Sequence, residues 1–300
     1  YFNNDRIVWS ESYSMLQPMI DISGDYIAVA DMGQQNVYLY DRSGYVARLN
    51  LARDITDLEV SRAGMIAIAS NEGNVNYIEI RDRQGNEIMT QKSMFSSSGY
   101  LMDLTLSEDG SRMAAVYVSV DRGTLKSRLV FYNLSGDYGG TEIITGSYEQ
   151  YDSILLTTVR FLDDHTVCAV GDTAVSLYQF QTEPELLYED LAIPWEIQSL
   201  FFSDRYVGMV VEENDPETRS VIKVMDLKGK TVLDMSIDFS YNRVDFAGSN
   251  VVLYNNHECL MYSLAGVEKL PELLDACDEI VIAQLQDRLS EFGQLLVIRP

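Results

Sequence analysis

The chain has 300 residues, of which 46% are hydrophobic and 23% charged, so it is long enough to bury a large core and does not have the composition of a disordered chain. Its 46 acidic and 22 basic residues give a formal net charge of −24. This charge repels polyanions and argues against nucleic acid and anionic membrane surfaces as partners.

Short apolar runs rich in Val, Ile and Tyr follow one another along the chain, each bounded by Gly, Asn, Asp or Ser. Examples are Tyr26–Ala30, Met65–Ser70, Arg112–Val120, Ser199–Ser203 and Asn250–Tyr254. Such runs are typical of strands. The nearest candidate for an amphipathic helix, Pro271–Leu289, fits a strand better in part. The sequence therefore predicts an all-β fold.

Many of these runs end in one frame, in which Asp or Asn is followed three residues later by Gly. Its copies begin at Asp41, Asp82, Asn133, Asp226 and, with Ser in the first place, Ser263; a degenerate copy has Gln179 and Thr182 at the two places. An Asp or Asn side chain accepts a hydrogen bond from the backbone two residues on, and Gly adopts the positive φ of a tight hairpin. The frame therefore predicts a repeated hairpin.

A second apolar pair of runs precedes each copy, which predicts a repeated four-strand unit with strands a, b, c and d. Successive Gly positions (or Thr182) lie 41, 51, 46, 47 and 37 residues apart, near the roughly 40–45 residues of a propeller blade. Six fourth strands are expected, near Val46–Leu51, Glu87–Lys92, Thr141–Gly146, Glu185–Glu189, Lys230–Ser236 and Gly266–Lys269.

The two ends of the chain are expected to build a further blade. Glu279–Gln286 and Gly293–Pro300 have the pattern of a and b strands, and Asp5–Ser12 stands where a d strand belongs. We predict that residues 5–12 pair with 279–299 and close a ring, because an open ring leaves exposed sheet edges. The expectation is a single propeller domain over residues 1–300 with seven four-stranded antiparallel blades, six or eight being the alternatives.

These repeats resemble the β-propeller superfamily, of the WD40-like or quinoprotein-like kind, although the Gly-His and Trp-Asp pairs of WD40 blades are absent. The run DISGDYIAVADMGQQNVYLYDRSG also resembles a family of uncharacterised propeller proteins of Gram-positive bacteria. That resemblance implies an N-terminal membrane anchor followed by an extracytoplasmic propeller. It implies no activity.

The residues give little sign of catalysis, a metal or a cofactor. His165 and His257 are expected on opposite faces of the disc, too far apart for a shared metal or dyad. Metal-binding motifs and Gly-rich phosphate loops are lacking. Three cysteines, at 168, 259 and 277, are too few for a disulfide framework. We expect no catalytic residue, no metal and no cofactor, with an enzyme that acts on glycans through paired carboxylates as an alternative.

Large aromatics in the connections between successive blades carry the functional expectation. The candidate ligand-binding residues are Tyr13, Phe95, Tyr148, Tyr151, Trp195 and Tyr241, with acidic neighbours at Asp54, Asp57, Glu149, Asp152 and Glu196. Loops of all blades converge on one face of a propeller, where Tyr and Trp are common anchors. The sequence thus predicts a binding or scaffold module for a protein, peptide or glycan of the cell envelope, or, alternatively, a structural subunit of an envelope assembly.

The location is predicted from the ends and the hydropathy of the chain. No stretch approaches the ~18–20 apolar residues of a membrane helix, and no signal peptide is evident. Because the chain begins at Tyr1 without an initiator Met, we expect a processed start and a missing N-terminal signal or anchor segment. The expected protein is a monomer outside the cytoplasm, anchored through that segment.

Overall fold

The computed structural model describes residues 2–3, 6–7, 9–135, 143–212, 220–255 and 257–269. Within these ranges the regular structure consists of strands and one four-residue helix, α1 (Phe95–Ser98). The prediction of an all-β fold is therefore confirmed. In the same ranges, no helix is both long enough and apolar enough to cross a membrane.

The first three sheets each contain four strands in chain order. Sheet 1 is β3 (Pro18–Ser23), β4 (Tyr26–Asp31), β5 (Asn36–Asp41) and β6 (Gly44–Asn50). Sheet 2 is β7 (Ile55–Val60), β8 (Ile66–Glu72), β9 (Val75–Arg81) and β10 (Glu87–Met94). Sheet 3 is β11 (Tyr100–Leu106), β12 (Arg112–Asp121), β13 (Thr124–Asn133) and β14 (Ile144–Asp152).

The next three sheets repeat this order. Sheet 4 is β15 (Leu156–Phe161), β16 (Thr166–Gly171), β17 (Val175–Phe180) and β18 (Pro184–Asp190). Sheet 5 is β19 (Glu196–Phe202), β20 (Tyr206–Glu212), β21 (Ser220–Asp226) and β22 (Thr231–Ile237). Sheet 6 is β23 (Arg243–Ala247), β24 (Asn250–Tyr254), β25 (Cys259–Ser263) and β26 (Glu268–Lys269). The six predicted four-strand units are confirmed, but the fourth strand of sheet 3, expected at Thr141–Gly146, is found at Ile144–Asp152.

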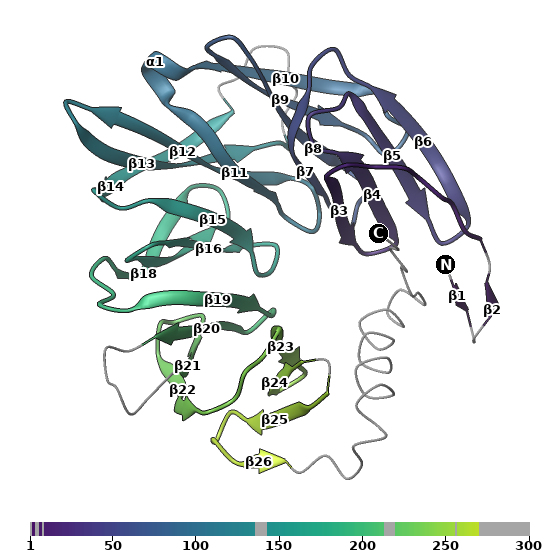
Figure 1. The fold of residues 1–300 in the computed structure, drawn as a ribbon. Helices are drawn as coiled ribbons and strands as arrows, with labels where there is room; N and C mark the ends of the chain where they lie inside the picture. The colour runs from purple at the N-terminus through teal and green to yellow at the C-terminus, as the bar shows by residue number, and fades with distance from the viewer. Residues whose placement is uncertain are drawn as a thin grey trace.

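The six sheets follow one another around an arc, with the first strand of each sheet on the inner side and the fourth at the rim (Figure 1). All neighbouring strands within a sheet are antiparallel. Turns between strands a and b and between c and d therefore lie on one face, which we call the turn face. Connections from d to the next a, and turns between b and c, lie on the opposite face, which we call the loop face.

The core lies between successive sheets. Five clusters of buried side chains each combine residues of two neighbouring sheets, from sheets 1 and 2 through to sheets 5 and 6. In a sheet with a neighbour on each side the middle strands are covered on both sides, and Ile66–Ser70 of β8 is an unbroken buried run. At the rim, β10 has no buried residue. Sheet stacking thus explains why apolar runs in the sequence are continuous in b and c strands.

The repeated frame owes its form to local hydrogen bonds. Asp82 Oδ1 accepts the backbone N–H groups of Gln84 and Asn86, and Gly85 at φ +84° donates its N–H to the Asp82 carbonyl. Asp226 and Gly229 repeat this arrangement at the β21–β22 turn. These contacts confirm the predicted hairpin chemistry, in which Asp caps the turn and Gly supplies the left-handed backbone.

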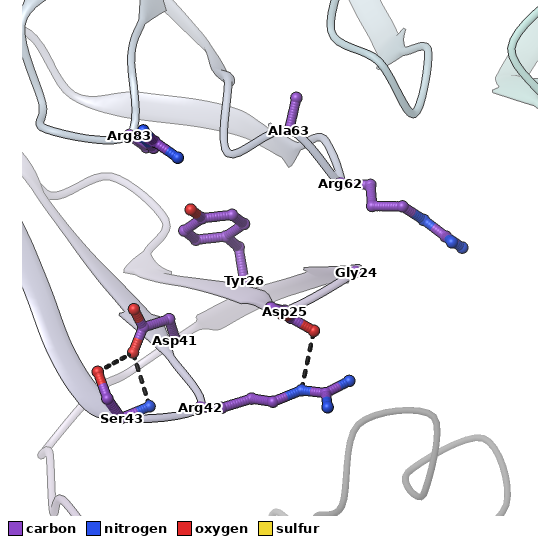
Figure 2. A pocket seen from close by; sticks show the side chains of 9 residues that line it. All are labelled: Gly24, Asp25, Tyr26, Asp41, Arg42, Ser43, Arg62, Ala63 and Arg83. Atoms are coloured by element: carbon purple, nitrogen blue, oxygen red, sulfur yellow. Dashed lines mark hydrogen bonds and ion pairs between the residues drawn. The ribbon is translucent and has the colours of Figure 1, made fainter.

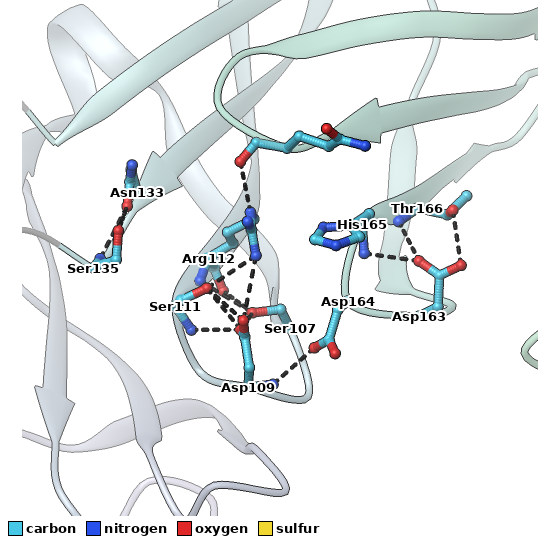
Figure 3. Close-up of polar contacts among 11 residues, drawn as sticks. Ser107, Asp109, Ser111, Arg112, Asn133, Ser135, Asp163, Asp164, His165 and Thr166 are labelled. Carbon is cyan, nitrogen blue, oxygen red and sulfur yellow. Dashed lines mark hydrogen bonds and ion pairs between the residues drawn. The ribbon is translucent and has the colours of Figure 1, made fainter.

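Turns of neighbouring sheets also bind one another on the turn face (Figure 3). The backbone N–H of Asp109, in the β11–β12 turn, donates to Asp164 of the β15–β16 turn at 2.8 Å. Arg112 Nε donates to the carbonyl of Gln181, in the β17–β18 turn, at 2.8 Å. Sheets 3 and 4 are therefore joined by polar contacts at their ends as well as by the core between them.

The N-terminal segment leads into sheet 1. Strands β1 (Phe2–Asn3) and β2 (Arg6–Ile7) pair with each other, and the Trp9 ring stacks on Tyr40 with centroids 5.0 Å apart. The predicted partner of residues 5–12, segment 279–299, lies outside the described residues. The seventh blade and the closure of the ring therefore stay predictions.

Candidate functional site

The loop face is the predicted recognition surface, and two of its expected anchors are partly exposed. Tyr13 is 42% exposed, and its ring lies 4.6 Å from that of Tyr38. The Tyr13 hydroxyl contacts that of buried Tyr40; burial and, second, this contact raise the pKa of Tyr40. Phe95 begins α1, is partly buried and packs edge-on against Tyr100 at 5.5 Å. Both rings belong to the loop face.

Tyr148 and Tyr151 lie within β14 and belong to the interior between sheets 3 and 4. The Tyr148 ring is 4.6 Å from that of Tyr178, and its hydroxyl donates to the Pro184 carbonyl at 2.6 Å. Tyr151 has no exposed surface, and its hydroxyl pairs with that of Tyr178 at 2.5 Å. Tyr151 therefore cannot be a surface anchor. Its place in the strand turns the ring into the core, which the loop-like segment SYEQYDS did not reveal.

Trp195 and Tyr241 precede β19 and β23 on the loop face, and both are partly buried. Lys223 Nζ lies 4.1 Å from the centroid of the Trp195 ring, and this ring packs against the core between sheets 4 and 5. The Tyr241 hydroxyl bonds Ser199 Oγ at 2.9 Å, and its ring packs against the next core. Both rings cap the ends of inter-sheet cores and leave only part of their surface for a partner.

A different set of apolar side chains is exposed on this face. Seven large ones, exposed between 41% and 89%, lie in d–a connections, at b–c turns or at the strand ends beside them: Tyr13, Leu16, Met32, Met94, Tyr100, Met102 and Val120. All seven belong to the loop face of sheets 1 to 3. Sequence reasoning ranked aromatics first and so missed Leu16, Met32, Met102 and Val120. The sequence feature that could have identified such residues is a large apolar residue among polar residues in a connection between strands.

Helix α1 organises the densest part of this set. The backbone N–H of Phe95 donates to the carbonyl of Asn74 in the β8–β9 turn, and Arg128 of β13 donates to the carbonyl of Ser98. The helix is therefore held between the b–c turn of sheet 2 and strand β13 of sheet 3. Met94 and Tyr100, 55% and 41% exposed, flank it.

Acidic residues around the loop face are mostly paired. Glu149 lies 3.8 Å from Arg128, Asp152 lies 3.6 Å from Lys126, and Asp54 accepts a hydrogen bond from Gln35. Glu196 is exposed. Asp57 departs from the expectation, because it lies on inner strand β7 and belongs to a different cluster.

That cluster, which we call the inner carboxyl cluster, consists of Asp21, Asp57, Glu59 and Asp103 on the inner strands β3, β7 and β11. Three of its members bind the backbone of the next inner strand. Asp21 accepts the N–H of Val60 at 2.6 Å, Asp57 that of Leu104 at 3.2 Å, and Asp103 that of Val159 at 2.7 Å. Each carboxyl therefore joins one sheet to the next along the inner side of the arc.

The four carboxyls of this cluster have pKa values above the ordinary range of Asp and Glu. Burial, and then the charge of Asp57, raise the pKa of Asp103 from 3.8 to about 7. Burial also raises the pKa values of Asp21, Asp57 and Glu59; Arg160 partly opposes this at Asp21 and Glu59. The side-chain contact between Asp57 and Asp103 adds to the rise in the pKa of Asp103 and partly opposes the rise in that of Asp57. When two carboxyls are in contact, ionising both brings two negative charges together, so one proton is retained and shared between them.

The Asp57–Asp103 pair does not have the arrangement of the two carboxyls used in glycoside hydrolysis. That chemistry places two carboxyls about 5–5.5 Å apart, or about 6.5–9.5 Å apart, with sugar or water between them. Here Asp57 and Asp103 bind each other directly, and each also accepts a backbone N–H of the following sheet. Their lone pairs are used in holding sheets together.

The histidines and cysteines also occupy structural positions. The backbone N–H of His165 bonds Asp163 in the β15–β16 turn, and that of His257 bonds Asn255 in the β24–β25 turn. These two turns lie on opposite faces. Cys168 and Cys259 are buried, and burial raises the pKa of Cys168. Among the described residues, no group of three or more His, Cys, Asp or Glu side chains has the arrangement to hold a metal ion.

Comparisons with known proteins place the chain in a family and a fold. A family of unknown function (DUF5711) matches residues 1–284, so the chain belongs to that family. No curated protein matches the sequence.

Solved β-propeller structures resemble the protein at low identity. Hsv2 of Kluyveromyces lactis superposes with a TM-score of 0.53 at 13% identity, over 80% of this chain and 77% of Hsv2. The β-propeller domain of the Trilobed protease from Pyrococcus furiosus, described as having an open velcro topology, gives 0.53 at 13% identity over 84% of each chain. Apo AztD of Citrobacter koseri gives 0.53 at 10% identity, over 84% of this chain and 71% of AztD. At these identities the likeness shows a propeller-like fold alone.

Proposed function

We propose that this member of the DUF5711 family is a non-catalytic binding module that recognises a protein or peptide through its loop face. The observation that carries the proposal is the set of seven exposed large apolar side chains on the loop face of sheets 1 to 3. Exposed apolar groups gathered on one face are typical of interaction sites.

The chemistry of these side chains favours a polypeptide over a sugar. Leu16, Met32 and Met94 are flexible aliphatic or thioether groups, 45–89% exposed, and such groups adapt to apolar side chains of a partner. Sugar rings need open aromatic faces, and Trp195 and Tyr241 are partly covered. A glycan is therefore the weaker candidate among the partners that the sequence left open.

Charge narrows the class of partner further. The protein has a formal net charge of −24, and exposed carboxylates at Asp54, Asp152 and Glu196 border the loop face. Basic or neutral polypeptides are drawn to such a rim, and acidic ones are repelled. We also propose an extracytoplasmic location, which the resemblance to anchored propeller proteins supports.

The proposed architecture is a closed ring of seven blades. The strand-like pattern of residues 279–286 and 293–300 supports a seventh unit, and the open velcro topology of the archaeal protease propeller is the alternative way to end such a ring. Deleting residues 1–8, before Trp9, distinguishes a closed ring from an open one. Closure predicts a melting temperature several degrees lower, whereas an unchanged value supports an open ring.

Site-specific photocrosslinking tests the binding proposal. A photoreactive phenylalanine analogue replaces Tyr100 on the loop face or, as the control, Tyr45, which is 58% exposed on the turn face. In living cells of the source organism, we expect one polypeptide to be captured from position 100 and not from 45. Equal capture at both positions, or none at position 100, contradicts the proposal.

A further inference from the structure

A pocket on the turn face lies opposite the proposed recognition surface. It has a volume of about 630 Å³ and opens between sheets 1 and 2. Its lining comes from both kinds of turn, including Asp25 and Arg42 of sheet 1 and Arg62 and Arg83 of sheet 2 (Figure 2). Small-molecule sites usually have volumes of about 300–1,000 Å³. The pocket is therefore large enough for a small ligand.

The lining is cationic, in contrast to the rest of the protein. Three of its nine residues are the arginines Arg42, Arg62 and Arg83, against two acidic residues, Asp25 and Asp41. The whole chain has about two acidic residues for each basic one. An anion that the protein as a whole repels therefore meets locally favourable charge here.

Two of the arginines keep donors for a ligand. Arg62 makes one ion pair, at 3.3 Å from Glu108, and both side chains are exposed. No described residue forms a hydrogen bond or ion pair with Arg83. A guanidinium has five N–H donors in a fixed fork that matches carboxylate and phosphate oxygens. Arg83 therefore has its full fork available.

Two glycines of the a–b turns let these side chains pack directly on the backbone. A Cβ on Gly64 would come within 2.8 Å of Arg83 Cβ and 2.9 Å of the Tyr26 ring, and one on Gly24 within 2.4 Å of Arg62 Cγ. Gly24 and Gly64 both have positive φ. The arginine stems and the Tyr26 ring thus lie directly on glycine backbone, which limits their freedom before a ligand arrives.

Tyr26 adds an apolar surface between the charged groups. Figure 2 shows its ring between Arg83 and Ala63 on one side and Asp41 on the other. Tyr26 is partly buried and packs against the core between sheets 1 and 2. An anion attached to a flat ring would contact both an arginine and this aromatic side chain.

We propose that this pocket binds a small ligand that carries a carboxylate or phosphate on a flat ring. Arg83 binds the oxyanion, and Tyr26 contacts the ring. This site is independent of the loop face, so each can fail without the other.

Titration of the intact protein with phenyl phosphate and with benzoate, followed by amide NMR, tests the site. We expect saturable shifts of the Gly24 and Gly64 amides, with Kd in the millimolar range or tighter, and no shift at Gly123 on the loop face. The variant Arg83→Gln should weaken binding about tenfold, because it removes the charged fork. Arg122→Gln, an exposed arginine on the loop face, is the matched control and should stay within about twofold.

The relative affinities of the two probes identify the chemical class of the ligand. Tighter binding of phenyl phosphate assigns a phosphoryl ligand, and tighter binding of benzoate assigns a carboxylate; either supports the site. Shifts that do not saturate, shifts of equal size at Gly123, or equal losses in both arginine variants overturn it. A normal amide spectrum for Arg83→Gln ensures that lost binding is not lost folding.

Discussion

Replacing Asp103 by Asn should stabilise the protein at alkaline pH. The carboxyl of Asp103 titrates at about 7 in the folded protein, against 3.8 in an unfolded chain. Ionising it in the fold is thus on the order of 4 kcal/mol more costly. Because Asp57 shares the proton, one substitution should recover only part of this, roughly 1–2 kcal/mol at pH 8.

Asparagine is the matched replacement because it preserves the contacts. Its carbonyl oxygen can accept the N–H of Val159, as Asp103 does at 2.7 Å, and its amide can donate to Asp57 in place of the carboxyl proton. Side-chain volume hardly changes. The substitution therefore removes the charge and keeps the join between β11 and β15.

The pH dependence has a definite sign. A folded pKa above the unfolded value means that the folded protein binds more protons between about pH 4 and 7. Stability from this group is full below pH 4 and is lost as pH rises through 7. The difference between the variant and the wild type should accordingly be small at pH 4 and grow toward pH 8.

Thermal and urea unfolding at pH 4.5, 6 and 8 measures this difference. At pH 8 we expect the melting temperature of Asp103→Asn to rise by roughly 2–6 °C. The control is Asp172→Asn, an exposed aspartate that accepts the N–H of Leu155 at 3.0 Å, which should show no such pH-dependent gain. Destabilisation by Asp103→Asn at pH 8, or a difference that does not vary with pH, would refute the reasoning.

Three further predictions follow from the core and the turns. Tyr151→Ala should destabilise the protein by about 3–5 kcal/mol in urea unfolding, because Tyr151 is fully buried, whereas Trp195→Ala should have a smaller effect. Gly229→Ala should lower the melting temperature more than Gly73→Ala: both glycines have positive φ, but only at Gly229 would a Cβ collide, at 2.0 Å from the Tyr188 ring. A chelator or a reductant should leave the melting temperature unchanged, and a shift of several degrees would reveal a bound metal or a disulfide.

The repeat made most of the fold predictable. Asp82 with Gly85, and Asp226 with Gly229, form hairpins through contacts within five residues, so their chemistry is legible in the sequence. Strand order followed from the same repeat. The predicted closure rests on residues 279–299, which lie outside the described part of the chain, and no local pattern establishes it.

The candidate sites were less predictable because they depend on which way a side chain points. Tyr151 and Tyr13 look alike in sequence, yet one is buried and the other 42% exposed. Asp57 and Asp103 lie 46 positions apart in the sequence and meet only when the inner strands of sheets 2 and 3 lie side by side. The arginines of the turn-face pocket likewise come from separate hairpins, where each resembles an ordinary solvated charge.

The most direct test of the proposed recognition surface is the affinity of the crosslinked partner for purified variants, measured by calorimetry. Met94→Ser and Tyr100→Ser remove exposed apolar groups beside α1, and Tyr45→Ser removes one of similar exposure from the turn face. Binding through the loop face predicts that each of the first two weakens the affinity about tenfold or more, while the third leaves it within about twofold. Equal affinities for all three variants, or a loss confined to Tyr45→Ser, would contradict it.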